Sequence, residues 1–422
     1  MTGLAIRPVR PDEWRTWRDL RLRALADAPD AFGETLAESQ NRDEAAWRSW
    51  VAPRADAIRL VAVRDGVPVG MMVVAIAEDA RRANVYAMWV APEARRAGAG
   101  RRLIETGLTW ARQQAALDVE LRVSDGQSAA RALYESCGLR STGDRGGLRD
   151  GSPVLCDTMA IRLPPLVMGV VNVTPDSFSD GGVYLDPAAA VAHGLELAAA
   201  GADILDVGGE ATNPRATGVG ATEELRRVLP VIERLVAAGA RVSIDTTKAE
   251  VARAAVGAGA SIINDVSGGL FDPAMAGVLA GVTYVAGHLR GRTLAEVFAA
   301  EAPASWREVA DELGARIRAL PEGTRVWGDP GIGFGKGADP EGNAELLRHA
   351  GDIAAALRRP IVVGPSRKRF LRRLLGMQEP DIQTLDAASV LASLAAVRAG
   401  AQVVRVHNVA LLHMHLTAYN KK

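Results

Sequence analysis

Eight short apolar runs in the second half of the chain each end in polar or ionisable residues. Three of these residues, Asp245, Asn264 and Asp329, follow the third, fourth and sixth runs. Their carboxylate oxygens and single amide offer several hydrogen-bond acceptors, which suits a flat heterocycle that carries N–H donors. The sequence therefore predicts a pocket for such a ring.

A second set of these residues suits an anion. Arg405 and His407 end the eighth run, and the carboxamide of Asn172 ends the first. Such groups hold phosphate through charge-assisted hydrogen bonds, and an amide oxygen can share a divalent ion with it. Lys368, after the seventh run, would reach both the ring and the anion. The fifth run ends in His288, which we expect on the same rim.

Strand and helix patterns explain why these residues would meet. From Leu166 onward, apolar runs such as "ADILDVGG" and "SIINDVSG" alternate with amphipathic helical stretches such as "DPAAAVAHGLELAAAGA". Eight strand–helix repeats predict a closed (β/α)8 TIM barrel, whose strands end on one rim. A single polar residue at a strand end could be a cap, but polar residues at every strand end predict a shared pocket. The loop after Asn172 would be its flap.

Residues 1–163 predict a separate α+β domain. A strand at "LAIRPV" leads into helices near 11–27 and 43–51, and further strands include "IRLVAVRD" and "RANVYAMWV". Only "LPP" separates this domain from the barrel predicted for residues 166–422. Because two prolines make a stiff joint, we expect the two domains to lie close together.

A Gly-rich turn in the N-terminal domain is suited to an anion. Gly98 and Gly100 remove side chains just where a helix begins, so that backbone N–H groups can approach a phosphate. Arg95, Arg96 and Arg101 add positive charge. Alone this pattern is weak evidence, because Gly-rich helix starts are common.

Composition excludes several classes of protein. The 422 residues contain 50 Lys+Arg and 50 Asp+Glu, so no net charge favours nucleic acid or a membrane surface. Two cysteines, Cys137 and Cys156, are too few for a disulfide framework or a thiolate metal site. The start of the chain lacks a signal-peptide pattern, and no apolar run is long enough to cross a bilayer. We therefore expect a cytoplasmic protein.

Residues 166–419 resemble dihydropteroate synthase. The resemblance rests on motifs in the same order: "NVTPDSFSDGG", "DVGGEAT", "SIDTTKAEVA", "INDVSGG", "DPGIGFGK", "GPSRKRF" and "VVRVHN". It implies a Mg²⁺-dependent condensation of 6-hydroxymethyl-7,8-dihydropterin diphosphate with p-aminobenzoate, which gives 7,8-dihydropteroate and diphosphate in folate biosynthesis. It also implies a homodimer formed through the last helices of the barrel.

The resemblance assigns roles to residues of this chain. Asn172 would hold Mg²⁺ and the diphosphate, which Arg405 and His407 would also bind. The pterin would be held by four residues: Asp245, Asn264, Asp329 and Lys368. The aryl amine would lie near Ser366, Arg367, Thr212 and Phe178. Asp381 and Asp386, beside a predicted helix start, are interpreted as caps.

Two loops depart from the family pattern. The second loop is "ATNPRA", with Asn213 where the family has Arg and Arg215 where Gly is usual. Because this loop helps to order the aryl-amine site, two alternatives stay open: Arg215 restores the charge, or the barrel takes a different acceptor. After the fifth strand the chain has "HLRG" where His-Met-Gln-Gly is common.

The Gly-rich turn and a later helix that contains Tyr134 resemble the GNAT acetyltransferases over residues 4–162. The resemblance implies an acetyl-CoA site made by Met88, Val90, Arg95, Arg96, Gly98, Ala99, Gly100 and Arg101. Tyr134 would protonate the departing thiolate, although it could equally be a core aromatic. The sequence does not reveal the amine acceptor.

Together these observations predict a bifunctional enzyme, an N-terminal acetyltransferase fused to a dihydropteroate synthase. Its substrates would be small molecules: pterin diphosphate, p-aminobenzoate and acetyl-CoA. The alternative is a pterin-binding barrel with an altered acceptor, in which the N-terminal domain serves as an acetyl-CoA sensor or an assembly module.

Overall fold

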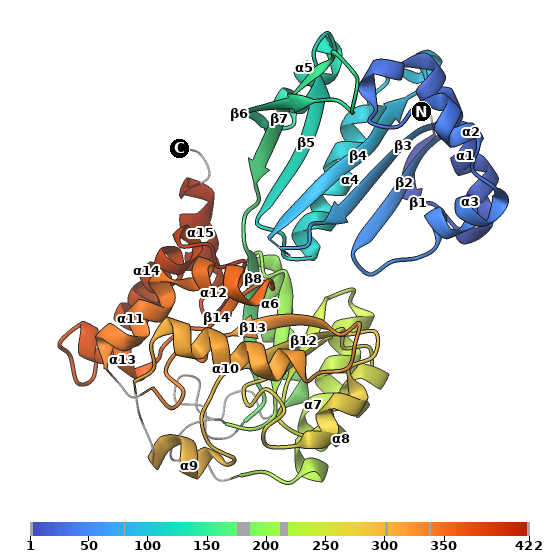
Figure 1. Cartoon of the computed structure of the whole chain (residues 1–422). Coiled ribbons are helices and arrows are strands. Elements are labelled where there is room, and N and C mark those ends of the chain that lie inside the picture. Colours follow the sequence, from blue (N-terminus) through green and yellow to red (C-terminus); the bar gives the residue numbers. More distant parts are fainter. Residues whose placement is uncertain are drawn as a thin grey trace. The chain divides into compact units, whose positions relative to one another are not determined.

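The computed structural model describes residues 3–79, 81–174, 186–211, 218–299, 303–336 and 339–419. The chain divides into two compact units, Met1–Leu163 and Pro164–Lys422 (Figure 1). Among the described residues, no helix is both long and apolar enough to cross a membrane.

The first unit is built on a sheet with the strand order β1-β2-β3-β4-β5-β7-β6. The strands are β1 (Leu4–Pro8), β2 (Ala57–Arg64), β3 (Val67–Ile76), β4 (Arg82–Val90), β5 (Asp118–Ser124), β6 (Arg140–Gly147) and β7 (Leu155–Arg162). Its helices are α1 (Trp14–Asp27), α2 (Leu36–Gln40), α3 (Glu44–Val51), α4 (Ala99–Gln113) and α5 (Ser128–Ser136). Helix α4 packs closely on β3, because a Cβ on Gly107 would lie 2.5 Å from Met72 Cε.

Strand β4 changes its partner halfway along. Its first half pairs with β5 in parallel, from Arg82 to Val85. A bulge follows at Ala87, which has φ = 52°, and the register with β3 shifts there. A bulge leaves backbone groups outside the ladder and bends the strand. The second half of β4 thus presents its backbone beside the start of α4.

The second unit is a parallel barrel, as the sequence predicts. Its strands are β8 (Leu166–Asn172), β9 (Ile204–Gly208), β10 (Val242–Asp245), β11 (Ile262–Asp265), β12 (Thr283–Gly287), β13 (Arg325–Asp329), β14 (Val362–Val363) and β15 (Val403–Val406). They follow the order β13-β12-β11-β10-β9-β8-β15-β14. A bridge between Gly328 and Ile361 joins the two end strands. The prediction of a (β/α)8 barrel is therefore confirmed.

Helices surround this barrel. They are α6 (Pro187–Ala199), α7 (Ala221–Ala237), α8 (Ala249–Gly257), α9 (Leu294–Ala299), α10 (Trp306–Arg318), α11 (Pro340–Arg348), α12 (Ala350–Leu357), α13 (Arg369–Leu374), α14 (Ile382–Arg398) and α15 (Val409–Tyr419). One expected helix is absent from the described residues, because β11 is followed only by the short 3-10 helix η4 (Pro273–Val278). The stretch between β11 and β12 is about as long as the one between β10 and β11, which holds α8, so its length does not explain the missing helix.

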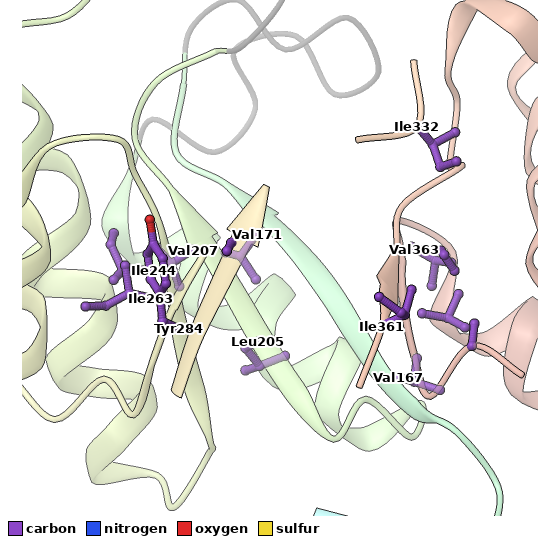
Figure 2. Close-up of a cluster of buried hydrophobic side chains, with 14 of the residues drawn as sticks. Val167, Val171, Leu205, Val207, Ile244, Ile263, Tyr284, Ile332, Ile361 and Val363 are labelled. Carbon is purple, nitrogen blue, oxygen red and sulfur yellow. The ribbon is translucent and has the colours of Figure 1, made fainter. Parts of the chain in front are cut away.

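Alternation along the strands separates two layers of side chains. Val167, Val171, Leu205, Val207 and Ile244 belong to one buried cluster with residues of the surrounding helices (Figure 2). Successive strand residues point to opposite faces of a sheet. The residues that alternate with these five along the strands therefore face the interior of the barrel. The polar residues that end the strands on this inner face meet at one rim.

Candidate active site

Arg405 lies at the centre of the rim and connects three strands. Its Nε donates a hydrogen bond of 2.6 Å to Asp206 Oδ2 on β9, and its Nη2 donates one of 2.7 Å to Asp245 Oδ2 on β10. Burial disfavours the charge of the guanidinium, but the carboxylates of Asp206 and Asp245 outweigh this effect and raise the pKa of Arg405. The guanidinium is therefore a fixed cation at the rim of the barrel.

Asp206 was missed as a site residue in the sequence. It is 0% exposed in the middle of β9, and it also accepts a hydrogen bond of 2.9 Å from Asn264 Nδ2. The available signal was a single carboxylate inside the apolar run "ILDVG". An isolated charge in a strand interior is costly unless it is paired, so this residue already required a cationic partner.

Burial disfavours the ionised form of two carboxylates at the rim. Burial raises the pKa of Asp245 to about 7, against the opposing effect of Arg405 and with a further contribution from Asp206. Burial likewise raises the pKa of Asp329, although Gly331 N donates a hydrogen bond of 2.7 Å to its Oδ1. Hydrogen bonds from the N–H donors of a ligand would therefore stabilise the ionised form of both carboxylates.

Lys368 lies beside these carboxylates. Its Nζ is 3.8 Å from the ring centroid of Phe334, in the loop after β13. Burial, helped by Arg405, lowers the pKa of Lys368 to about 8, while Asp329 and Asp245 oppose the shift. The structure thus brings Asp245, Asn264, Lys368 and Arg405 together through shared hydrogen bonds and electrostatic contacts.

Ser366 holds His407 through two contacts. The hydroxyl accepts a hydrogen bond of 3.3 Å from the backbone N–H of His407 and lies 2.9 Å from its Nδ1. The hydroxyl has one proton and two acceptor lone pairs, so it can serve either ring tautomer at Nδ1. Burial, Arg367 and Arg405 lower the pKa of His407 well below its usual value. His407 is therefore a neutral N–H donor.

Arg367 and Asp386 form a buried pair. Arg367 Nε donates a hydrogen bond of 2.7 Å to Asp386 Oδ1, and Asn408 Nδ2 donates one of 3.0 Å to Asp386 Oδ2. The interpretation of Asp386 as a cap is wrong, because it lies inside α14 and is 6% exposed. Asp381 is the cap, and its side chain accepts from Thr384 N.

His288 does not join the pocket, so that prediction is wrong. It follows Gly287, an inward-facing strand end, and therefore points outward. The ring is 1% exposed, and its Nε2 lies 3.0 Å from Glu312 Oε2 on α10. Arg290, the departure in "HLRG", donates a hydrogen bond of 2.5 Å from Nη2 to Glu312 Oε1. This departure stabilises the outer wall of the barrel.

The structure places several of the predicted site residues less completely. Asn172 ends β8 and is half-buried. Thr212, Asn213, Arg215 and Phe178 lie outside the described residues. The ends of the second loop are held by Glu210, which accepts a hydrogen bond of 3.1 Å from Val219 N and pairs with Lys248.

In the first unit, the turn before α4 has the geometry of an anion site. Gly98 has φ = 84°, and a Cβ there would meet no atom within 4 Å. The first bond of the helix runs from Arg102 N to Gly98 O, so the N–H groups of Ala99, Gly100 and Arg101 precede the helical ladder. Such N–H groups attract phosphate.

The glycines and arginines around this turn have different tasks. A Cβ on Gly100 would lie 2.9 Å from Leu133 Cδ2, so this glycine permits close packing of α4 on α5. Arg95 bonds to Asp27 and to Val90 O, and Arg101 Nη2 donates a hydrogen bond of 2.9 Å to Ser136 Oγ.

Arg96 and Tyr134 are the other two residues that the sequence predicts for this site. Arg96 lies in the turn itself, with φ = 60°. Tyr134 on α5 is 7% exposed. Burial, with Cys137 nearby, raises the pKa of Tyr134 to about 12. The phenol is therefore protonated at neutral pH and can only give a proton.

Comparisons with known proteins identify both units. Residues 168–407 match the family model of pterin binding enzymes, and residues 14–139 match that of the acetyltransferase (GNAT) family. The dihydropteroate synthase of Mycobacterium leprae is 45% identical over 260 residues, which are 58% of this chain and 89% of that protein.

A plant relative and a solved structure agree with these matches. The mitochondrial folate synthesis bifunctional protein of Arabidopsis thaliana is 40% identical over 58% of this chain and 47% of that protein, so the chain spans about half of that relative. The structure of Xanthomonas albilineans dihydropteroate synthase with 4-aminobenzoic acid has a TM-score of 0.53 and 45% identity, covering 61% of this chain and 93% of that one.

Proposed function

The chain belongs to the family of pterin binding enzymes and carries a GNAT domain before its barrel, and on this premise we propose which residues perform the two reactions. It is a dihydropteroate synthase fused to an acetyl-CoA-dependent acetyltransferase. The barrel condenses 6-hydroxymethyl-7,8-dihydropterin diphosphate with an aryl amine and releases diphosphate.

The observation that carries the assignment of the barrel site is the contact of Arg405 with two buried carboxylates at the rim. The pterin lies over this cation, and its N–H donors bind Asp245, Asp329 and the oxygen of Asn264. Lys368 donates to the acceptor edge of the ring. The remaining donors of Arg405 and the imidazole N–H of His407 bind the diphosphate.

Asn172 is suited to share a Mg²⁺ ion with the diphosphate. Among the described residues, no group of three or more His, Cys, Asp or Glu side chains is placed to hold a metal. Mg²⁺ typically takes one or two protein oxygens and obtains its other ligands from substrate phosphates and water, which a single carboxamide satisfies. When bound, the ion supplies charge to stabilise the leaving diphosphate.

The residues of the chain then have three tasks. The pocket holds the pterin methylene carbon in line for attack, so that orientation is fixed before the reaction. The C–O bond breaks with its electron pair going to the diphosphate, whose negative charge Arg405 and His407 stabilise, and the amine nitrogen forms the new C–N bond. The amine needs no strong base, because a neutral aryl amine is already a nucleophile and loses its proton after the bond forms.

We place the aryl amine beside Ser366 and Arg367, and the family resemblance adds Thr212 and Phe178 to this site. The buried pair of Arg367 with Asp386 supports this placement, because it holds the arginine rigid at the end of β14. p-Aminobenzoate is the proposed acceptor. The full chain would be incubated with the pterin diphosphate, Mg²⁺ and a panel of aryl amines, and the products identified by mass. If a product forms with another amine and none forms with p-aminobenzoate, the proposed acceptor is wrong and that other amine takes its place.

In the acetyltransferase, we propose that the diphosphate of acetyl-CoA binds the N–H groups of Ala99, Gly100 and Arg101, with Gly98 giving access. Arg96 adds charge, whereas Arg95 and Arg101 orient the turn through their protein contacts. The pantetheine arm pairs with the β4 backbone from Met88 to Val90.

Tyr134 protonates the departing thiolate, because its phenol stays protonated and its helix α5 packs against the start of α4 through Leu133 and Gly100. A Tyr134→Phe variant of the full chain keeps the ring and should bind acetyl-CoA normally while losing acetylation. Tight acetyl-CoA binding by the wild-type chain without acetylation of any amine would instead favour a sensor.

We also propose a homodimer in the cytoplasm. Leu391 on α14 and Met414 on α15 are 67% and 58% exposed, so the last two helices offer an apolar face for a second barrel. Cys137 and Cys156 are unpaired thiols, which is typical of a reducing compartment. Sedimentation of the wild type and a Leu391→Glu variant would test the dimer, since a monomeric wild type contradicts it.

A further inference from the structure

Asp206 lies beneath the proposed pterin pocket and contacts two of its residues at once. The side chain is 0% exposed on the inner face of β9. Its Oδ2 accepts from Arg405 Nε at 2.6 Å and from Asn264 Nδ2 at 2.9 Å. The carboxylate thus joins β9 to β15 and to β11.

The contact with Asn264 decides which way the amide points. As the partner of a guanidinium, the carboxylate of Asp206 accepts hydrogen bonds and gives none. The NH₂ group of Asn264 must therefore face Asp206, and its carbonyl oxygen is turned to the other side. A ligand that reaches Asn264 meets an acceptor and has to offer an N–H group there.

The contact with Arg405 decides the plane of the guanidinium. Nε bonds to Asp206 and Nη2 bonds to Asp245 at 2.7 Å, so two neighbouring donors on one edge of the guanidinium are fixed. A planar guanidinium held at two corners cannot rotate. Its remaining donors keep one direction.

We propose that Asp206 is a positioning residue of the dihydropteroate synthase reaction, which sets the donor and acceptor pattern of the pterin pocket through Asn264 and Arg405. This inference rests on the proposed function of the barrel. It assigns Asp206 no contact with the reacting atoms, and its effect is on the binding and orientation of the pterin.

Asp206 also acts on Asp245 through its charge. The groups that face Asp245 are Arg405 on β15, Asp206 on β9, Glu224 on α7 and Lys368 after β14. After burial and Arg405, the negative charge of Asp206 contributes to the raised pKa of Asp245. Removing that charge lowers the pKa of Asp245, and its ionised form then persists to lower pH.

The main test is Asp206→Asn in the full chain, which keeps the shape and removes the charge. We expect the KM for the pterin diphosphate to rise about tenfold to a hundredfold, as for the loss of a charged hydrogen bond. The KM for the aryl amine should stay unchanged. Because the ligand N–H groups need ionised Asp245, the acid limb of pterin binding should move to lower pH.

The matched control is Asp265→Asn. This carboxylate is also 0% exposed at the end of β11, but it points outward and bonds to Ser267, Gly269 and Tyr284. The substitution should lower thermal stability and leave the pterin KM and its pH profile unchanged. If the acid limb shifts in this variant as well, loss of any buried carboxylate of the barrel has the same effect as loss of Asp206, and the proposal is overturned.

A second variant tests the same contact from the other side. Asn264→Asp places two carboxylates against each other, so one of them must hold a proton and the acid limb should move to higher pH. This outcome does not depend on whether Asp206→Asn folds. An unchanged pH profile in both variants, or in Asn264→Asp alone if the other does not fold, would overturn the proposal.

Calorimetry with free pterin separates this proposal from the proposed function. Wild-type chain that binds pterin but forms no dihydropteroate would refute the assigned reaction. The binding difference between the wild type and Asp206→Asn would still report on Asp206 in that case. Equal pterin affinities for these two proteins at every pH would refute the positioning role.

Discussion

At the scale of single residues, the barrel rim concentrates buried charge. Asp206 and Asp245 share one guanidinium, and Lys368 lies near Asp245 with a lowered pKa of about 8. Groups that are costly to bury gain most when a ligand with complementary donors and acceptors arrives. The pocket is therefore organised for binding at the expense of stability, and two substitutions should reveal this.

Replacing Asp245 by Asn should stabilise the protein at neutral and higher pH. The pKa of Asp245 is raised from the ordinary value to about 7, so the folded state keeps a proton that the unfolded chain has lost above pH 4. Wild-type stability must fall as the pH rises from about 4 to about 7. In urea unfolding, the free energy of unfolding of the variant should rise relative to that of the wild type as the pH increases over this range. A constant difference at every pH would contradict the assignment.

Replacing Arg405 by Lys should discriminate between the two halves of the ligand. An ammonium keeps the charge but cannot bond to Asp206 and Asp245 and still face the diphosphate. Affinity for the pterin diphosphate should fall about tenfold or more, since charged hydrogen bonds contribute about 1.5–3 kcal/mol. The affinity for free pterin should fall by a smaller factor. Calorimetry with both ligands measures this, and an equal loss would mean that Arg405 does not contact the diphosphate.

At the scale of elements, strand alternation decides which strand-end residues face the pocket. Asn264 and Asp265 are neighbours on β11, yet the first bonds to Asp206 inside the barrel and the second to Tyr284 outside it. His288 is displaced outward by the same rule. One step along a strand changes a ligand residue into a residue of the barrel wall.

Helix α7 is attached to the start of α8 by an ion pair with a buried carboxylate, which should be costly to break. Lys248 Nζ lies 2.6 Å from Glu224 Oε2, and Glu224 is fully buried. Lys248→Met leaves that charge without its partner, which costs about 3–5 kcal/mol. Arg226→Met, on the exposed side of α7, should change stability little, because it pairs only with Glu223 in solvent. Chemical denaturation compares them, and similar losses would contradict the role of the buried pair.

At the scale of the whole molecule, the fusion predicts a relation between the two reactions. We expect the acetyltransferase to act on an amine related to the barrel's chemistry, such as p-aminobenzoate, a sulfonamide-like analogue or a pterin amine. The equal numbers of acidic and basic residues give no attraction to charged polymers. The alternative is a fusion without a shared metabolite.

The test uses the full chain with acetyl-CoA. Acetylation of aryl and pterin amines would be compared with that of aliphatic amines and lysine peptides, with Tyr134→Phe as the control for spontaneous transfer. Loss of product in the control assigns the transfer to this site. Acetylation confined to lysine peptides or aliphatic amines would refute the shared metabolite.

The sequence by itself determined the two folds and most of the pocket. Eight apolar runs that end in polar residues require one rim, because a parallel barrel places the carboxyl ends of its strands together. Asp245, Asn264 and Arg405 could be named from this pattern and from the family motifs. The Gly98 turn could be named from its glycine spacing together with the family resemblance, because Gly-rich helix starts alone are common.

Only the tertiary structure decided how these residues are connected. Asp206 contacts Arg405, which lies 199 positions away in the chain, so no local pattern could pair them. Asp386 was interpreted as a cap from its place near a helix start, yet its partner Arg367 comes from the end of another strand. Local spacing fixes which face of a strand or helix a residue occupies. The closure of the barrel decides which residue it meets there, because that depends on every strand between them.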